Sequence, residues 1–276
     1  MTSPLRYLPR PNELRRMTSS DVRDAFLLSG HFTPGGFRLT LTDADRLAVG
    51  GVVPLRRMQL PPVSAFGTEY FTERRELGVF NIGAPGLIRV GGEVFQLDRF
   101  DCLYIGMGND DVAFEPATDE PPVFYLVSSP AHHAHPVRLI PSAEAESVQL
   151  GDHGHANCRR LRRYVHSGGA PSCQLVMGMT ELGPGGVWNT MPPHTHSRRS
   201  EIYLYFDLPE NELVFHFFGQ PDETRHVIVR DREAVISPPW SMHSGVGTAP
   251  YRFIWAMAGE NQQFDDMDAM SPGAMR

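Results

Sequence analysis

The chain has 276 residues, 41% of them hydrophobic and 21% charged, which is enough for one large core or two of ordinary size. Its 25 basic and 32 acidic side chains give a net charge of −7, which disfavours nucleic acid or an anionic membrane surface as the main partner. The sequence contains no lysine, which excludes Schiff-base enzymes and P-loop kinases. Arginine can still grip a carboxylate, so a small acidic substrate remains compatible with the composition.

Cysteine usage and hydropathy bear on the compartment. The three cysteines, Cys102, Cys158 and Cys173, are an odd number without paired spacing, which argues against a disulfide framework and fits a reducing compartment. The first residues lack the apolar segment of a secretion signal, and no later run approaches the roughly 20 apolar residues of a membrane helix. We therefore expect a cytoplasmic protein that is neither secreted nor membrane-spanning.

The predicted elements are one early helix followed by many short strands. The helix covers residues 20–28, with acids in its first turn and Gly30 after its end. Short runs rich in Val, Ile, Leu, Phe and Tyr then alternate with Gly, Pro, Asp or Asn, as is typical of strands. These runs are residues 87–90, 103–105, 123–127, 202–206, 213–218, 227–229 and 235–236. The pattern predicts an all-β fold with a short N-terminal helix.

The two halves of the chain resemble each other. Residues 73–76 align with residues 197–201, and the strands that follow are similarly spaced in both halves. Self-similarity of this kind indicates two copies of one β-barrel unit. We predict an N-terminal segment over residues 1–29, a first barrel over 30–150 and a second barrel over 151–276.

The second half holds a candidate metal site. His194 and His196 are two residues apart, which on an extended chain puts both imidazoles on one face. Glu201 follows five residues later, so the chain between must bulge or turn to bring its carboxylate to them. His243, in a proline-rich turn, offers a third imidazole. This donor set suits Zn, Fe, Mn, Ni or Co, and catalysis would need a further open coordination position.

The first half does not repeat these ligands. In the alignment, Tyr70, Thr72 and Asp111 occupy the positions of the three histidines, and Glu76 lies near the position of the carboxylate. We therefore expect the first barrel to lack metal ligands.

Other polar clusters favour structural interpretations. The histidines at 132–135 and 153–155 lie in Pro/Gly-rich stretches and are expected at the surface. Residues 159–163 include four arginines, which we interpret as a solvated face or a contact between subunits rather than a nucleic-acid patch. Cys158 and Cys173 are expected to be buried and unreactive.

The order of His194-x-His196, Glu201 and His243 resembles the metal motif of the cupin superfamily, and two units resemble a bicupin of tandem, jelly-roll-like barrels. Longer stretches are similar to the 5-keto-4-deoxyuronate isomerases, also called 4-deoxy-L-threo-5-hexosulose-uronate ketol-isomerases. These stretches are residues 70–79, 188–192, 219–226 and 264–268, and the resemblance extends from about residue 21 to residue 268.

The resemblance implies one Zn²⁺ per subunit, with other divalent metals as alternatives. The ligands it implies are His194, His196, Glu201 and His243. It also implies a cytoplasmic homo-oligomer, a hexamer, that acts in pectin and oligogalacturonide degradation. The implied reaction converts 5-dehydro-4-deoxy-D-glucuronate to 3-deoxy-D-glycero-2,5-hexodiulosonate through an enediol, an intramolecular oxidation and reduction.

Such a reaction needs a base and a group that holds the substrate carboxylate. A metal-bound carboxylate is a poor base because the cation lowers its basicity. Candidates for the base are His226, Glu223 and Glu260, and candidates for substrate binding are Arg198, Arg199 and Arg225. Two other functions stay open at this point: a cupin non-haem metal dioxygenase and a non-catalytic sugar-acid-binding cupin.

Overall fold

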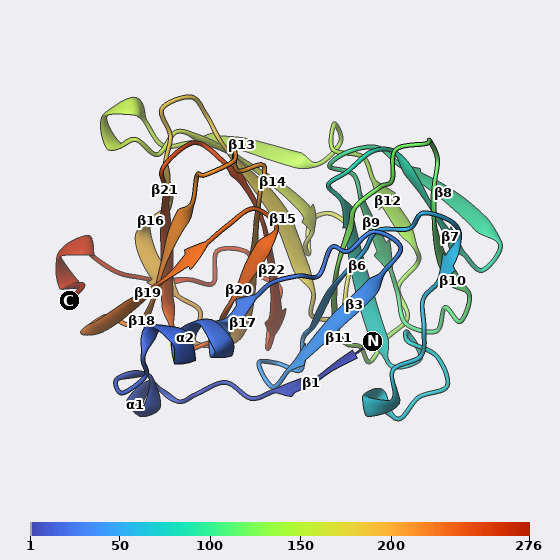
Figure 1. Ribbon diagram of the computed structural model, residues 1–276, viewed down its shortest axis with the longest axis horizontal. Helices are drawn as coiled ribbons and strands as arrows, with labels where there is room; N and C mark the ends of the chain where they lie inside the picture. Colours follow the sequence, from blue (N-terminus) through green and yellow to red (C-terminus); the bar gives the residue numbers. More distant parts are fainter. Residues whose placement is uncertain (1) are drawn as a thin grey trace.

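The computed structural model describes residues 2–276, and its regular secondary structure is mostly β-strand (Figure 1). In the N-terminal half the strands are β1 (Thr2–Arg6), β3 (Phe37–Thr42), β4 (Ala48–Val52), β5 (Met58–Gln59), β6 (Arg75–Asn81), β7 (Gly86–Val90), β8 (Glu93–Leu97), β9 (Cys102–Ile105), β10 (Val112–Pro116), β11 (Phe124–Pro130) and β12 (Arg138–Ile140). They form a seven-stranded sheet in the order β1-β3-β4-β11-β6-β9-β12 and a four-stranded sheet in the order β5-β10-β7-β8.

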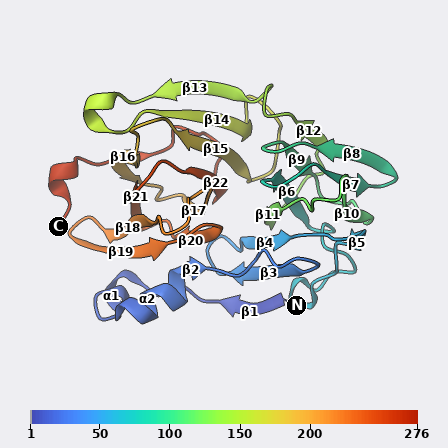
Figure 2. The ribbon, with the colours of Figure 1, turned by 45° about the horizontal axis from the view of Figure 1, so that its top comes forward.

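The C-terminal half has the same two-sheet plan. Its strands are β13 (Glu146–Leu150), β14 (Arg159–Val165), β15 (Val176–Leu182), β16 (Trp188–Thr195), β17 (Arg199–Phe206), β18 (Val214–Gln220), β19 (Glu223–Val229), β20 (Glu233–Ser237), β21 (Met242–Gly247), β22 (Arg252–Gly259) and β23 (Asp268–Ala269), joined by β2 (Leu27–Leu28) from the N-terminal segment. The sheets run β13-β14-β15-β22-β17-β20-β2 and β19-β18-β21-β16-β23. The predicted all-β fold of two tandem barrels is confirmed, and Figure 2 shows the barrels side by side.

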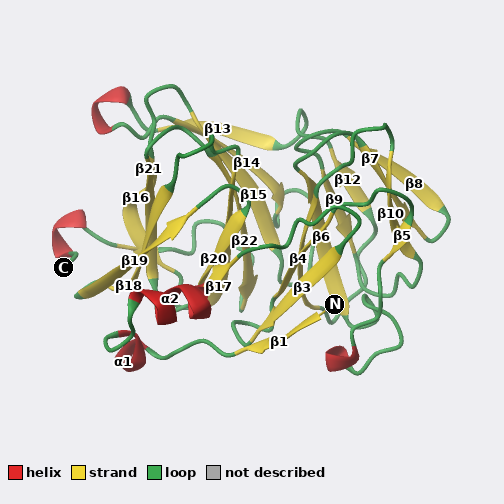
Figure 3. Ribbon diagram, viewed as in Figure 1, coloured by secondary structure: helices red, strands yellow, loops and turns green. Residues whose placement is uncertain are grey.

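Helical segments are few and short (Figure 3). They are α1 (Pro11–Leu14), α2 (Ser19–Phe26) and the single 3₁₀ turns η1 (Ser64–Phe66), η2 (His153–His155) and η3 (Pro272–Ala274). Both α-helices lie against the C-terminal barrel, whereas β1 pairs with β3 of the N-terminal one (Figure 1). No helix within residues 2–276 is long and apolar enough to cross a membrane.

The predicted helix at 20–28 needed correction at both ends. It begins one residue earlier, after Thr18, whose side chain accepts a hydrogen bond from the main-chain N–H of Asp21 and caps the helix. It ends at Phe26, because Leu27 turns to an extended conformation and forms β2 with Leu28. Both leucines are buried where β2 pairs with β20, so burial against the sheet outweighs continuation of the helix.

Three apolar clusters hold the molecule together. Two of them fill the interiors of the two barrels, and the third lies between the two seven-stranded sheets. Strand β17 shows how one strand serves two clusters, because its side chains alternate between faces. Tyr203 and Tyr205 point into the C-terminal barrel, whereas Ile202, Leu204 and Phe206 pack in the cluster between the sheets.

Glu76 connects the barrels and does not mark the remnant of a metal site. It is fully buried on β6, and its carboxylate accepts hydrogen bonds from the hydroxyls of Tyr104 (2.7 Å) and Ser129 (3.0 Å). It also accepts from the main-chain N–H groups of residues 173–175 in the C-terminal half, at 2.7–2.8 Å. In strand register Leu77, not Glu76, corresponds to Glu201, since the pairs Leu77–Ile105 and Glu201–Ser237 are equivalent. The predicted alignment of Glu76 with Glu201 was therefore wrong by one residue. A shift of one residue places the side chain on the opposite face of the strand.

Two pairings bear on the predicted domain division. Strand β13 precedes the predicted boundary at residue 150, yet it pairs with β14 in the C-terminal sheet. Strand β2 lies in the predicted segment 1–29 and pairs with β20. The division into 1–29, 30–150 and 151–276 stays a prediction. Within the segment 1–29, β1 pairs with the first barrel, whereas α1, α2 and β2 pack on the second.

Candidate metal centre

Four side chains converge inside the C-terminal barrel. The ligand atoms of His194, His196, Glu201 and His243 all lie within 4.8 Å of one another. Nε2 of His194 is 3.0 Å from Nε2 of His196 and 3.2 Å from Nε2 of His243. Among residues 2–276 this is the only group of three or more His, Cys, Asp or Glu side chains with such geometry, and the first barrel has none.

Strand pairing brings these residues together. His194 at the end of β16 lies opposite His243 on β21, and Glu201 near the start of β17 lies opposite Ser237 on β20. After His196 the chain makes a tight turn, closed by a hydrogen bond from the N–H of Arg199 to the carbonyl of His196 at 3.0 Å. This is the turn that the five-residue spacing between His196 and Glu201 predicts, and it brings the carboxylate to the side of the imidazoles.

Hydrogen bonds on the far side of the rings hold their orientation. Nδ1 of His243 lies 3.1 Å from Oγ of Ser237, and Nδ1 of His196 lies 3.1 Å from the carbonyl oxygen of Asp266. A ring that donates from Nδ1 has a free lone pair on Nε2, the atom that faces the other ligands. The partners around the cluster therefore favour the tautomer that binds a metal.

The electrostatics also fit a bound cation. Burial lowers the pKa of His194 to about 2 and also lowers that of His243, which makes a proton on either ring easier for a metal to displace. Burial alone would raise the pKa of Glu201, but the adjacent His243 and His196 outweigh it and hold that pKa well below its ordinary value. Oε2 of Glu201 lies 3.0–3.1 Å from Nε2 of these two histidines without hydrogen-bond geometry to either. Imidazole nitrogens crowded around a buried carboxylate oxygen that accepts no hydrogen bond are the donor set of a divalent metal.

A cavity of about 240 Å³ opens beside the four residues. Its walls are Leu150, Arg159, Leu161, Thr180, Thr190, Met191, Pro192, His194, His196, Glu201, Tyr203, Phe253, Trp255, Met257, Phe264 and Met267. Most of the side chains in the wall are apolar, and Arg159 is the one arginine among them. The cavity therefore combines a candidate metal centre with one site for an anionic group.

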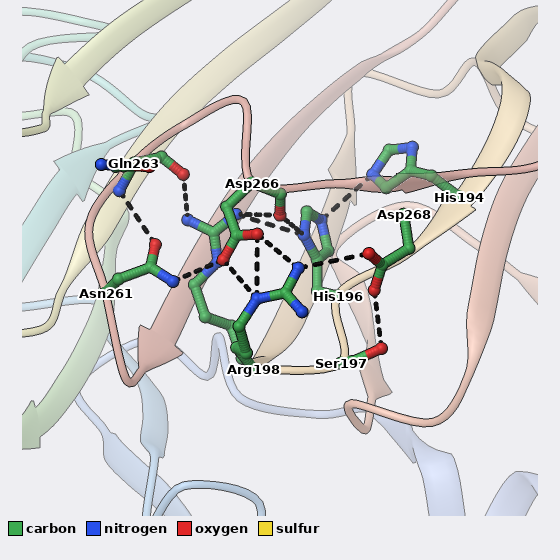
Figure 4. Close-up of polar contacts among 9 residues, drawn as sticks. His194, His196, Ser197, Arg198, Asn261, Gln263, Asp266 and Asp268 are labelled. Carbon is green, nitrogen blue, oxygen red and sulfur yellow. Dashed lines mark hydrogen bonds and ion pairs between the residues drawn. The ribbon is translucent and has the colours of Figure 1, made fainter.

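A C-terminal segment, residues 260–269, covers one side of the centre, and we call it the strap (Figure 4). Arg198 holds the strap by ion pairs with Asp266 and Asp268, and Oγ of Ser197 donates to Asp268 at 2.6 Å. Arg199 is fully buried and donates to the carbonyl oxygens of Gln263 (2.7 Å) and Asp266 (2.8 Å). The strap carries Phe264 and Met267 into the cavity wall.

Comparison with known proteins places the chain in a family. A family profile described as KduI/IolB matches residues 28–271. The chain belongs to the KduI/IolB family. It is 52% identical over 270 residues to the 4-deoxy-L-threo-5-hexosulose-uronate ketol-isomerase of Opitutus terrae, covering 97% of each chain. It is 49% identical over 265 residues to the protein of the same name from Halalkalibacterium halodurans, covering 95% of this chain and 96% of that one.

Solved structures share the fold of this KduI/IolB protein at low sequence identity. An IolB-like protein from Salmonella typhimurium superposes with a TM-score of 0.67 at 15% identity, over 81% of this chain and 86% of that one. The oxalate decarboxylase of Lactobacillus farciminis gives a TM-score of 0.59 at 9% identity, over 81% and 79% of the two chains. These likenesses concern the two-barrel architecture alone.

The residues predicted to bind substrate do not line the cavity in this family member. Arg198 and Arg199 hold the strap, as described above. Arg225 forms an ion pair with Glu223 at 2.8 Å and donates to the carbonyl oxygen of Arg15. Arg198 and Arg199 thus support the site through the strap, whereas Arg225 lies outside the site.

The candidate bases are also outside the cavity. His226 is exposed on β19 beside Phe215 and Phe217. Glu223 pairs with Arg225, and Glu260 is exposed at the start of the strap. None of the three lines the cavity, so their role as base stays a prediction that this geometry does not support.

Sequence reasoning missed the cavity residues Arg159 and Tyr203. The stretch 159–163 is predicted to be a solvated face or a contact between subunits. It forms β14, on which side chains alternate, so only part of it is exposed, and no subunit contact is tested. Arg159 and Leu161 point into the cavity, whereas Arg160 is exposed. The available signal was the apolar Leu161 two residues after Arg159, because on a strand these two side chains share one face.

Two further expectations can be compared with the structure. The histidines at 132, 133, 153 and 155 are exposed, as predicted, whereas His135 is half-buried. Cys158 and Cys173 are free but only half-buried, so the expectation of full burial was wrong for both. The cause for Cys173 is its place at the junction between the barrels, where its Sγ lies 3.1 Å from the carbonyl oxygen of His133.

Proposed function

We propose that this protein is a 4-deoxy-L-threo-5-hexosulose-uronate ketol-isomerase, which converts 5-dehydro-4-deoxy-D-glucuronate to 3-deoxy-D-glycero-2,5-hexodiulosonate. The observation that carries the proposal is identity of 52% and 49% over nearly the full chain to proteins of that name. The cavity supports it, because three of the four candidate metal ligands, His194, His196 and Glu201, line the same space as an arginine. A substrate with an aldehyde at one end and a carboxylate at the other needs both features.

We propose His194, His196, Glu201 and His243 as the ligands of a Zn²⁺ ion. When bound, this Lewis acid polarises the substrate aldehyde and its neighbouring hydroxyl and stabilises developing negative charge. The chain's own part is to present three imidazoles and one carboxylate in a fixed arrangement. The absence of lysine from the chain supports metal assistance for a carbonyl shift, because no Schiff base can form on a side chain.

We assign Arg159 to the substrate carboxylate. It lines the cavity and is half-buried, and its Nη1 donates to the carbonyl oxygen of Asn157 at 2.9 Å, which orients the guanidinium. Burial lowers the pKa of Arg159, although the arginine remains charged at neutral pH. A planar guanidinium in a mostly apolar wall binds a carboxylate through charge-assisted hydrogen bonds. This assignment replaces Arg198, Arg199 and Arg225.

Tyr203 offers a hydroxyl group in the cavity. Its oxygen lies 3.4 Å from Oγ1 of Thr190, and burial together with the nearby Glu201 raises its pKa well above the ordinary value. The phenol therefore keeps its proton and can donate a hydrogen bond to a substrate oxygen. The surrounding Phe253 and Trp255 exclude water, which strengthens each of these polar contacts.

Proton NMR of the freshly prepared substrate with the purified protein tests the function. We expect the signal of the hydrated aldehyde at C1 to be replaced by the signal of a new C1 methylene. A chelator should stop this conversion, and added zinc should restore it. Oxygen consumption with iron in the protein would instead indicate the dioxygenase. Uronate binding without turnover by fully metallated protein would indicate a sugar-acid-binding cupin.

We also propose that the protein is a cytoplasmic homo-oligomer, a hexamer, as its family resemblance implies. Several large apolar side chains are exposed, among them Tyr7, Leu55 and Val148, which a subunit contact would cover. Light scattering on the purified protein should give six times the mass of the 30.8 kDa chain. A mass equal to one chain would refute the assembly without bearing on the reaction.

A further inference from the structure

Two adjacent arginines occupy the same place in both barrels. Arg74 and Arg75 lead into β6, as Arg198 and Arg199 lead into β17. The same main-chain hydrogen bond marks this place in both barrels. The N–H of Ala131 donates to the carbonyl of Arg74 at 2.9 Å, and the N–H of Glu260 donates to the carbonyl of Arg198 at 3.0 Å. The first barrel therefore has a counterpart of the region beneath the strap.

The two regions differ in charge. In the second barrel, Asp266 and Asp268 of the strap pair with Arg198. In the first barrel the equivalent place is a cavity of about 440 Å³ with no acidic residue in its wall. The wall consists of Leu5, Leu41, Thr42, Arg46, Ala65, Phe66, Thr68, Arg74, Arg75, Pro130 and Ala131. Three arginines face this cavity without a carboxylate among them.

Arg75 is the buried member of the three, with 7% of its surface exposed. Its Nε donates to Oγ of Ser128 at 3.0 Å, and its Nη2 donates to the carbonyl oxygens of Ser128 (2.9 Å) and Arg46 (2.7 Å). The ring of Phe66 lies 4.4 Å from its Cζ. All these contacts are with uncharged acceptors or an aromatic face, so the side chain is fixed without a direct ion pair. The carboxylate of Glu76 acts on it only through space. Burial and the neighbouring Arg46 lower the pKa of Arg75 to about 10, as expected for crowded cations.

The nearest carboxylates are directed elsewhere. Glu76, the next residue on β6, points to the opposite face of the strand and bonds the other barrel. Glu73 lies 3.7 Å from the exposed Arg74, and its other oxygen accepts from the N–H of Glu69. Neither lines the cavity.

We propose that this cavity is a second binding site, for a small oxyanion such as the carboxylate of a sugar acid or a phosphate group. Arg75 presents a fixed guanidinium, and Arg46 and Arg74 add charge from the rim. Phe66 and Leu41 offer an apolar wall for a short carbon skeleton. The site is separate from the metal centre and does not depend on the reaction assigned to it.

Isothermal titration calorimetry tests the site with two probes, D-galacturonate and inorganic phosphate. The protein carries Arg159→Met, so that binding of a uronate in the metal-site cavity does not contribute. Arg46→Asn removes one rim charge, and asparagine tolerates the positive φ of 52° at this turn while keeping the carbonyl that Arg75 uses. Arg232→Asn is the matched control, because Arg232 also lies in a turn with φ 59° but outside this cavity.

We expect saturable binding of at least one probe, weakened at least about fivefold by Arg46→Asn, unchanged by Arg232→Asn and weakened by salt. Binding of galacturonate alone would assign the site to organic acids, and binding of both probes would assign it to oxyanions in general. No saturable binding below about 10 mM, or equal effects of the two substitutions, would overturn the proposal. Arg46 is not among the candidate metal ligands or the walls of their cavity, but the adjacent Asp45 accepts a hydrogen bond from the N–H of Ser200 beside Glu201. An unchanged midpoint of thermal unfolding is therefore the check that Arg46→Asn is folded.

Discussion

Arg199 lies directly behind His196, with its Nη2 3.2 Å from Nδ1 of the imidazole. The same Nη2 donates to the carbonyl oxygen of Asp266 at 2.8 Å, and that oxygen is also 3.1 Å from Nδ1 of His196. The guanidinium and the strap carbonyl thus form one unit that fixes the ring. Since Arg199 is fully buried, it acts through this ring and the strap and not by contact with substrate.

Arg199→Lys should therefore weaken zinc binding by about 10-fold to 100-fold, because partners behind a ligand orient it. Competition with a chromophoric chelator measures the affinity. The control is Arg198→Lys on the same turn, which pairs with Asp266 and Asp268 but does not contact His196. Equal zinc affinity for Arg199→Lys and the natural protein, both folded by thermal unfolding, would contradict the positioning role.

Arg159→Met should reduce kcat/KM by about 10²-fold to 10³-fold, because it removes the charged partner of the substrate carboxylate. Most of the loss should be in KM, since the carboxylate is bound before and during the reaction. Arg160→Met is the control on the same strand, with its side chain exposed on the other face. Similar kinetics for the two variants would show that Arg159 does not hold the carboxylate.

Glu76→Gln should lower the free energy of unfolding by about 2–4 kcal/mol, because an amide cannot replace a carboxylate that accepts from three main-chain N–H groups and two hydroxyls. Urea denaturation measures the change. Glu93→Gln, at an exposed position on β8, should change the stability by less than about 0.5 kcal/mol. A loss at Glu76 no larger than that at Glu93 would mean that the carboxylate does not hold the barrels together.

His31 should make the fold sensitive to acid. It is 9% exposed with Nε2 3.0 Å from Oγ1 of Thr40, and burial and the nearby Arg6 and Arg38 lower its pKa to about 4. Between pH 6.5 and 4 the unfolded chain binds a proton that the folded chain does not, so stability falls as the pH falls. At pH 4.5 this residue should lower the free energy of unfolding by about 2–3 kcal/mol relative to pH 7.

The comparison uses urea denaturation of the natural protein and His31→Gln at pH 7 and pH 4.5. Glutamine can keep a hydrogen bond to Thr40 but has no group that titrates in this range. The variant should lose less stability on acidification than the natural protein. An identical loss in both proteins would place the acid sensitivity elsewhere.

His194, His196 and Glu201 were predictable as a cluster because their signals are local, whereas His243 was joined to them by the resemblance to the cupin motif. The spacing of His194 and His196 and the turn before Glu201 need only the period of a strand. The role of Arg159 was not predictable in the same way, because it depends on which face of β14 meets the cavity. Glu76 shows the same difficulty, since a register shift of one residue moved it from the barrel interior to the contact between the barrels.

The fold class was predictable from many short apolar runs between turn residues, whereas the packing of the ends was not. Leu27 and Leu28 continue a helical pattern, yet they join the sheet beside β20. Pairing between residues about 200 positions apart in the sequence cannot be read from local propensity. The strap is a similar case, because its hold on Arg198 and Arg199 is set by the folded barrel.

We propose the His194, His196, Glu201 and His243 cluster as the metal centre at which the uronate is isomerised. Zinc content and isomerase turnover, measured together on His194→Ala and on His226→Ala, test this assignment. We predict that His194→Ala loses both zinc and turnover, whereas His226→Ala, exposed on β19, keeps both. Retained zinc and unchanged turnover in His194→Ala would contradict the account.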